Sequence, residues 1–169
     1  ATVARDEDGK PRPGRRHVGV FGPGHGSLQT TQVRTYAALL QAAKDLGEDG
    51  ESDPWWTLMA FFNSLRELGG ALSLLQRDVP NRRQVLKQRM GREWAEMRKL
   101  RDTLELTGRL NSEEVQRAVE SLSVSQGDSE RPVDVCLASN IIEVGVDIAR
   151  LSLLVIVGQP KTTGQYIQV

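Results

Sequence analysis

Residues 133–160, VDVCLASNIIEVGVDIARLSLLVIVGQP, hold two apolar runs with small polar residues, a glycine and an aspartate between them. Short runs rich in Val, Leu and Ile are typical of buried β-strands. The same pattern extends through the chain, with strands expected at 17–21, 55–63, 103–110, 133–140 and 151–158 and helices at 30–46, 64–78 and 111–122. Apolar strands that alternate with helices indicate a parallel sheet covered on both faces. We therefore expect an α/β fold with a three-layer, mostly parallel sheet.

The composition limits the class of protein. The 169 residues include 22 Lys and Arg against 22 Asp and Glu, so any basic surface must be local. One cysteine excludes an internal disulfide, and two histidines provide no metal-ligand cluster. No apolar run approaches the roughly 18 residues of a membrane span, and the N-terminus lacks the apolar segment of a signal peptide. We expect a cytoplasmic protein with no membrane partner and no metal site of its own.

The chain divides into a flexible tail or linker at 1–16 and one domain at 17–169. The domain begins with an extension at 17–54. A basic helical insertion at 79–101 contains Trp94 and eight Lys or Arg against two Glu. This insertion could follow a phosphate backbone, although a solvated, charged helix face is the commoner explanation of such a run.

Small and polar residues follow each expected strand of the domain. In an open parallel sheet, ligands bind beyond the carboxyl ends of the strands, where loop amides and helix N-termini meet. Small hydroxyl and amide groups there can donate hydrogen bonds to phosphate oxygens without filling the groove. Ordinary capping of helices is the alternative explanation for any single pair. The residues in these positions are Asn63, Ser64, Thr107, Gly108, Arg109, Ser139, Asn140, Gly158 and Gln159.

Gly145 and Asp147 stand apart in the segment VGVDI. The glycine permits a turn that a larger residue resists. The aspartate lies between Val146 and Ile148, where an unpaired carboxylate is costly, so it needs a partner. Asp147 is therefore either a structural cap or a polar contact in a nucleotide cleft.

Several other residues favour packing over chemistry. Trp55 and Trp56 precede an apolar run, so core and rim packing is favoured over base stacking. Cys136 lies between Val135 and Leu137 and reads as a small buried hydrophobe. The pair Gly69 and Gly70 weakens a helix, which predicts tight packing against the sheet or an irregular first turn.

The stretch ASNIIEVGVDI resembles motif V of superfamily 2 helicases, and QYIQV resembles the approach to motif VI, with Gln168 as its first residue. FFNSLRELGGAL resembles motif IV, and LELTGRLNSEEV resembles the strand and turn before motif V. Together these segments cover 55–169. Further details resemble large bacterial helicases, including the helicase subunit of the DISARM anti-phage system.

This resemblance implies the second, RecA-like lobe of an ATP-dependent helicase or translocase. The implied partners are nucleic acid, with DNA expected, the N-terminal helicase lobe, and other subunits of a defence complex. By matching position, Gly145, Asp147 and Gln168 would line the ATP cleft. The residues implied to contact the nucleic-acid backbone are Asn63, Ser64, Thr107, Gly108, Arg109, Ser139 and Asn140.

The departures from the family are equally specific. The sequence has no G-x-x-x-x-G-K-[ST] loop for phosphates and no Walker B carboxylate pair for Mg²⁺. ATP and Mg²⁺ are therefore expected on the absent first lobe, and this chain alone should not hydrolyse ATP. The chain stops at the start of motif VI and reads as truncated. The alternatives are a non-catalytic nucleic-acid clamp or assembly platform, or an unrelated α/β enzyme that uses Asp147 as a base.

Overall fold

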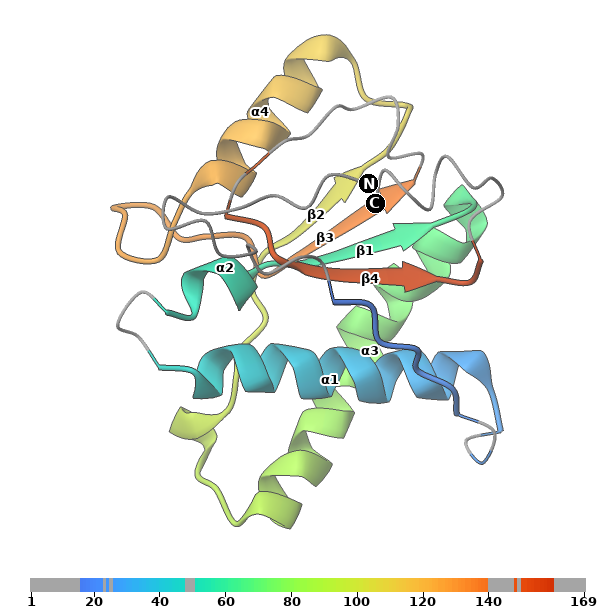
Figure 1. The fold of residues 1–169 in the computed structure, drawn as a ribbon, viewed down its shortest axis with the longest axis vertical. Helices are drawn as coiled ribbons and strands as arrows, with labels where there is room; N and C mark the ends of the chain where they lie inside the picture. The colour runs from blue at the N-terminus through green and yellow to red at the C-terminus, as the bar shows by residue number, and fades with distance from the viewer. Residues whose placement is uncertain are drawn as a thin grey trace, which may run out of the picture.

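The structure is a computed structural model that describes residues 16–22, 24, 26–47, 51–139, 148 and 150–159. The elements follow one another along the chain (Figure 1). They are α1 (Leu28–Asp45), α2 (Asp53–Trp56), β1 (Leu58–Phe62), α3 (Leu65–Met90), the 3₁₀ helix η2 (Trp94–Glu96), β2 (Thr103–Leu106), α4 (Ser112–Ser123), β3 (Val135–Ser139) and β4 (Leu153–Val157).

The four strands form one sheet in the order β2-β3-β1-β4. Every neighbouring pair is parallel. The central strands β1 and β3 are buried along their whole length, whereas the edge strands β2 and β4 are partly exposed. The α/β class and the parallel sheet are confirmed, and continuous burial applies to the two inner strands only.

Successive side chains along each strand point to opposite faces of the sheet, and each face has its own hydrophobic cluster. On one face, Leu58, Ala60 and Phe62 pack with α1 and α3; on the other, Met59 and Phe61 pack with α4. Figure 1 shows α1 and α3 on one side of the sheet and α4 on the other. The expected three layers are present.

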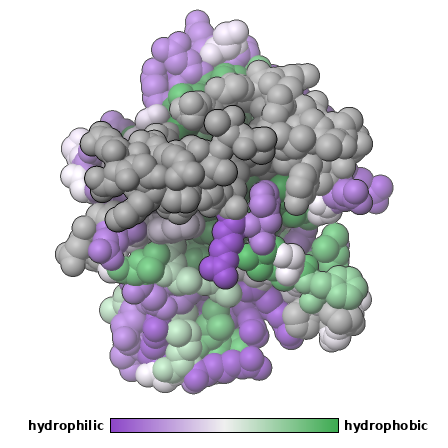
Figure 2. Space-filling model, in the orientation of Figure 1, coloured by the Kyte–Doolittle hydropathy of each residue, from purple (hydrophilic) through white to green (hydrophobic). Residues whose placement is uncertain are grey.

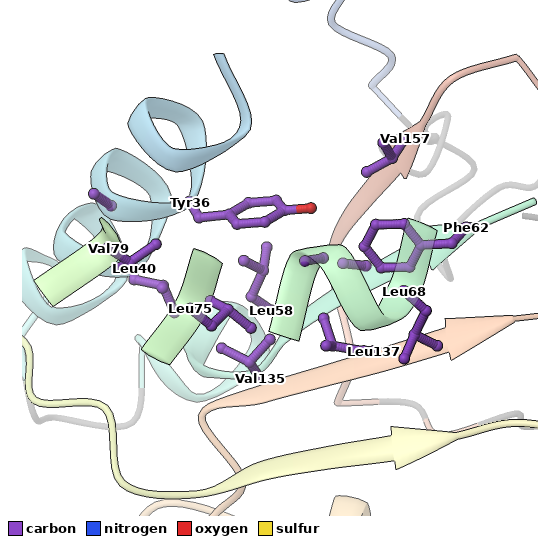
Figure 3. Packing of buried hydrophobic residues seen from close by; sticks show 13 residues of the cluster. Tyr36, Leu40, Leu58, Phe62, Leu68, Leu75, Val79, Val135, Leu137 and Val157 are labelled. Carbon is purple, nitrogen blue, oxygen red and sulfur yellow. The ribbon is translucent and has the colours of Figure 1, made fainter. Parts of the chain in front are cut away.

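The cluster on the α1 and α3 face is the larger of the two (Figure 3). Tyr36 and Leu40 of α1 are buried in it together with Leu75 and Val79 of α3. Burial raises the pKa of the Tyr36 hydroxyl. Helix α1, which the sequence analysis placed in an extension, is therefore part of the same core as the sheet.

Helix α3 is one continuous helix of 26 residues. Ser64 caps its N-terminus, and Gly91 ends it with a φ of 62°, in the left-handed region that glycine tolerates. The expected end of this helix at residue 78 is wrong, because the basic segment, expected to be helical over 79–101, continues the same helix as far as Met90. Pro80 lies inside the helix, and the packing of Val79 and Leu86 on the core offsets the hydrogen bond that a proline removes.

Two expected strand assignments are also wrong. Trp55 and Trp56 belong to α2, because Pro54 near the first helical position favours a short helix before β1. The segment 17–21 forms no strand, and its Val18, Val20 and Phe21 side chains are exposed. An apolar run that pairs with no neighbouring strand gains nothing from its β propensity.

The remaining details concern small residues. Apart from the backbone of α3 itself, a Cβ added at Gly69 or Gly70 would meet no atom within 4 Å, so tight packing against the sheet, one of the two expected explanations of these glycines, is wrong. Cys136 is fully buried as expected, and burial raises the pKa of its thiol to about 12.

Within the described part of the chain, no helix is long and apolar enough to cross a membrane, and no three His, Cys, Asp or Glu side chains group as metal ligands.

Candidate nucleic-acid interface

The strand register brings the predicted polar positions to one edge of the sheet. Phe62 at the end of β1 lies opposite both Ser139 of β3 and Val157 of β4. Leu106 at the end of β2 lies opposite Ala138 of β3, one residue before Ser139. The residues that follow these strand ends therefore share an edge, which we call the carboxyl rim: Asn63, Ser64, Thr107, Gly108, Arg109, Ser139, Gly158 and Gln159. Their proximity agrees with the sequence analysis, and their contact with a ligand stays a prediction.

Ser64 stands where β1 passes into α3. Its Oγ accepts a hydrogen bond of 3.3 Å from the Glu67 backbone N–H, so it is the N-cap of α3. A hydroxyl that accepts at a cap still has its own proton to donate. The exposed Ser64 hydroxyl thus lies beside the free N–H groups of the first turn of α3. Capping and anion binding are compatible at this residue.

Thr107 begins the turn between β2 and α4. Its side chain is largely buried and accepts a 3.4 Å hydrogen bond from the Arg109 N–H, while the Leu110 N–H donates to the Thr107 carbonyl at 3.1 Å. Gly108 and Arg109 are exposed at the tip of the turn. This arrangement leaves Arg109 as the cation of the described rim that can reach outwards from the turn.

Ser139 ends β3, an inner strand. Its relative exposure is 7%, so it offers one hydroxyl at the floor of the rim and little side-chain surface. Strand β3 lies between β1 and β2, and Ser139 is therefore placed between the Ser64 and Thr107 positions. The three hydroxyls follow the strand order across the rim.

Asn63 has a structural role that the sequence analysis missed. Its Nδ2 donates a 3.0 Å hydrogen bond to the Gln159 carbonyl, which ties the end of β1 to the end of β4. Gly158 has a φ of 78°, and a Cβ there would lie 3.4 Å from Asn63 Nδ2. One amide proton of Asn63 is thus used within the rim. The glycine directly after an apolar strand was the signal for this tight turn.

Four predicted site residues lie outside the described residues. They are Asn140 of the backbone-contacting set and Gly145, Asp147 and Gln168 of the ATP-cleft set. Their roles stay predictions.

Comparison with known proteins identifies the domain. Residues 95–169 match the model of the helicase conserved C-terminal domain. The chain is also 42% identical over 169 residues to the DISARM protein DrmA of Bacillus paralicheniformis. The chain carries the C-terminal lobe of a superfamily 2 helicase. The alignment with DrmA covers 98% of this chain and 15% of that protein, so the chain spans a small part of the length of its curated relative.

The match to the helicase C-terminal domain begins inside η2 and includes β2, α4, β3 and β4. The elements α1, β1 and α3 precede the matched residues, yet β1 lies between β3 and β4 in the sheet. The folded helicase lobe therefore includes residues well before residue 95.

A deeply buried ion pair of the helicase lobe, between Arg98 and Asp134, lies at the opposite edge of the sheet, where the strands begin. We call this edge the amino edge. Arg98 Nη2 donates to Asp134 Oδ1 at 2.7 Å, and both side chains are almost fully buried. The Arg98 guanidinium carbon lies 3.1 Å from the centroid of the Trp56 ring. Burial lowers the pKa of Arg98 to about 10, against the opposing effect of Asp134. The backbone N–H groups of Arg101 and Asp102 donate to the other Asp134 oxygen, at 2.7 and 3.1 Å.

A second ion pair at this edge, which we call the Asp53–Arg150 clamp, joins Arg150 to α2. Arg150 donates to the Asp53 carboxylate at 3.2 Å from two of its nitrogens, and to the Leu122 carbonyl at 2.8 Å. Burial raises the pKa of Asp53, but hydrogen bonds from Arg150 and from the Gln126 N–H lower it by more than burial raises it. The pKa of Asp53 therefore lies below its usual 3.8. Both arginines pair with a carboxylate inside the lobe, although Nε and Nη1 of Arg98 are buried without a hydrogen-bond partner. These internal ion pairs make the amino edge a structural edge of the lobe.

Proposed function

We propose that this chain is the second motor lobe of an ATP-dependent nucleic-acid helicase or translocase that acts in anti-phage defence. The observation that supports this function best is the shared carboxyl rim, to which the parallel register brings Ser64, Thr107 and Ser139. The similarity to DISARM protein DrmA supports the role in defence. DNA is the nucleic acid that we propose, and the cytoplasm is the proposed location.

The rim is suited to the backbone of one strand. Ser64, Thr107 and Ser139 carry hydroxyls that can donate to phosphate oxygens, and the first turn of α3 adds backbone N–H groups. Arg109 supplies a local positive charge in a chain whose net charge is zero. Contacts of this kind fix the position of a strand without reading its bases.

The proposed ATP site is shared with a first lobe. Gly145, Asp147 and Gln168 are assigned to this chain's side of the cleft, whereas ATP and Mg²⁺ are held mainly by the N-terminal lobe. Closure of two lobes around a nucleotide and reopening after hydrolysis is an established way to couple chemistry to motion. This chain by itself should show no turnover.

The rim is tested by equilibrium binding of a labelled DNA single strand to the complete protein. Ser139→Ala and Thr107→Val remove one donor each, and we expect each to weaken the Kd about 10-fold to 150-fold, as the loss of a hydrogen bond to a charged group does. Ser123→Ala is the matched control, because that hydroxyl donates to the Val119 carbonyl within α4. Wild-type affinity in both rim variants would remove the rim from the binding surface.

The nucleotide role is tested by nucleic-acid-stimulated ATP hydrolysis in the complete protein. Asp147→Ala should abolish stimulation while DNA binding persists. Full turnover in that variant removes Asp147 from the cleft. A wild-type protein that binds DNA but never hydrolyses ATP would instead support the non-catalytic clamp.

A further inference from the structure

The distal half of α3 extends beyond the hydrophobic core. Val79 is the last fully buried residue of this helix, and 11 helical residues follow it up to Met90. At 1.5 Å per residue α3 is about 39 Å long, whereas the five residues of β1 span about 17 Å. Figure 1 shows α3 running past α1 to the end of the molecule away from the strand tips. This end is thus remote from the carboxyl rim.

The projecting segment and the two residues after it are basic in sequence. Residues 80–92 contain five Lys or Arg and no Asp or Glu. Arg82 and Arg89 lie seven residues apart and therefore share one face of α3. In Figure 2 this end of the molecule is largely hydrophilic, with apolar patches between the polar side chains.

Arg34 of α1 joins Arg82 and Arg89 to form a cationic cluster. Helix α1 packs against α3 through Tyr36, Leu40 and Val79, which brings Arg34 to the side of the helix that carries Arg82. Burial lowers the pKa of Arg82, and the charges of Arg89 and Arg34 lower it further. None of the three has an ion pair with a described carboxylate, and Arg82 Nε is buried without a hydrogen-bond partner. Arg92, in contrast, pairs with Asp45 at 2.6 Å. Clustered cations without a carboxylate are suited to an external polyanion.

Trp94 lies beside the neighbouring face of the same helix. The Arg83 guanidinium carbon is 5.9 Å and the Lys87 ammonium nitrogen 5.7 Å from the centroid of its ring. Lys87 also lies 3.8 Å from the largely exposed Glu93 carboxylate. The Trp94 residue is nevertheless 48% exposed, because η2 holds it at the surface with a capping box between Glu93 and Glu96. An exposed indole next to two cations offers a stacking surface.

We propose that Arg34, Arg82 and Arg89 bind the phosphates of a nucleic-acid single strand and that Trp94 stacks on one of its bases. This surface is a second contact, separate from the rim, and it rests on the proposed nucleic-acid binding of the lobe. A single strand is the favoured occupant because only an unpaired base presents an open ring to an indole, while its phosphates neutralise adjacent arginines. An acidic protein surface would use the arginines but would leave the indole without a matching role.

The test measures the Kd of the complete protein for a labelled oligo(dT) over a series of salt concentrations. The double variant R82Q/R89Q should bind more weakly, and the slope of log Kd against log salt should fall by about 1.4, since each phosphate contact on a single strand contributes about 0.7. The matched control is R117Q, which removes an exposed arginine of α4. Trp94→Ala should weaken binding at least about 5-fold and Trp94→Phe should retain most of it.

The outcomes separate this surface from the rim. Ser139→Ala should weaken binding without changing the salt slope, because it removes a neutral donor. If the rim variants weaken binding while R82Q/R89Q and Trp94→Ala bind like the wild type, the second contact is overturned and the proposed function stands. If the wild-type protein fails to bind any single strand, both proposals fail.

Discussion

Asp134 immediately precedes β3 and accepts hydrogen bonds from four residues. Its oxygens accept from the side chains of Arg98 and Arg131 and from the backbone N–H groups of Arg101 and Asp102. Because the Arg98 guanidinium is buried, loss of the Asp134 carboxylate leaves a charge that neither water nor a carboxylate compensates. The pair therefore fixes the segment before β2 to the start of β3.

Asp134→Ala should lower the free energy of unfolding by about 3–5 kcal/mol, since it removes one partner of a buried ion pair. Urea denaturation measures this change. Arg117→Ala breaks a pair with Glu113 in which both side chains are at least 75% exposed, and it should change stability by less than about 1 kcal/mol. Equal losses in the two variants would contradict the structural role of Asp134.

The sequence could predict single residues only where local pattern defines them. Ser64, Thr107 and Ser139 follow apolar runs directly, and their common edge follows from a parallel sheet. The Arg98 and Asp134 pair spans 36 positions of sequence, and no local periodicity connects them. The hydrogen bond from Asn63 to Gln159 spans 96 positions, so the sequence could not show it, and Asn63 was predicted only as a ligand contact.

Among the elements, α3 carries two glycines that its environment does not require. Gly70 has a helical backbone, and no atom lies within 4 Å of an added Cβ. Gly70→Ala should therefore raise the free energy of unfolding by about 0.5–1 kcal/mol, which urea denaturation can measure.

Gly158 provides the contrasting control. Its φ of 78° is unfavourable for alanine, so Gly158→Ala should destabilise the lobe and loosen the turn after β4. Equal effects of the two substitutions would show that backbone conformation does not decide them.

Element boundaries were the least predictable part of the fold. Pro80 lies inside α3, although proline in a helix interior costs about 3 kcal/mol. Packing of Val79 and Leu86 on either side overrides that local cost. The helix expected from residue 111, in contrast, is confirmed: Asn111 and Glu114 form a capping box at the start of α4, with hydrogen bonds of 2.9 and 2.8 Å. Local signals thus succeed where both partners are close in sequence.

For the whole molecule, the clamp between Asp53 and Arg150 makes stability depend on pH. The folded pKa of Asp53 lies below its usual 3.8, so the unfolded chain takes up this proton first as the pH falls. The contribution of Asp53 should be complete above its usual pKa and should disappear as the pH falls through the lowered, folded value.

Urea midpoints of the wild type and Asp53→Asn, measured across the acidic range, check this dependence. Their difference should be largest near neutral pH and should narrow below about pH 4. A difference that stays constant down to the most acidic point would contradict the proposed linkage.

The strand order shows what sequence alone leaves open at this scale. Alternating helices and strands predicted a parallel sheet, but they could not place β1 between β3 and β4. That order depends on which apolar faces fit together, for example Tyr36 and Leu40 of α1 against the same face as Leu58. Nor could the pattern show that residues 28–45 complete the core of a domain whose family match begins at residue 95.

The sulfur of Cys136 is sealed inside β3, between the two layers of helices. Cys136 is the one cysteine of these 169 residues, so its labelling reports on one location within this lobe. A thiol-specific dye can react with Cys136 only while local opening of the sheet exposes the sulfur. The labelling rate therefore measures how often this part of the sheet opens. If motor cycling strains this lobe, ATP turnover should increase the labelling rate of Cys136 in the complete protein.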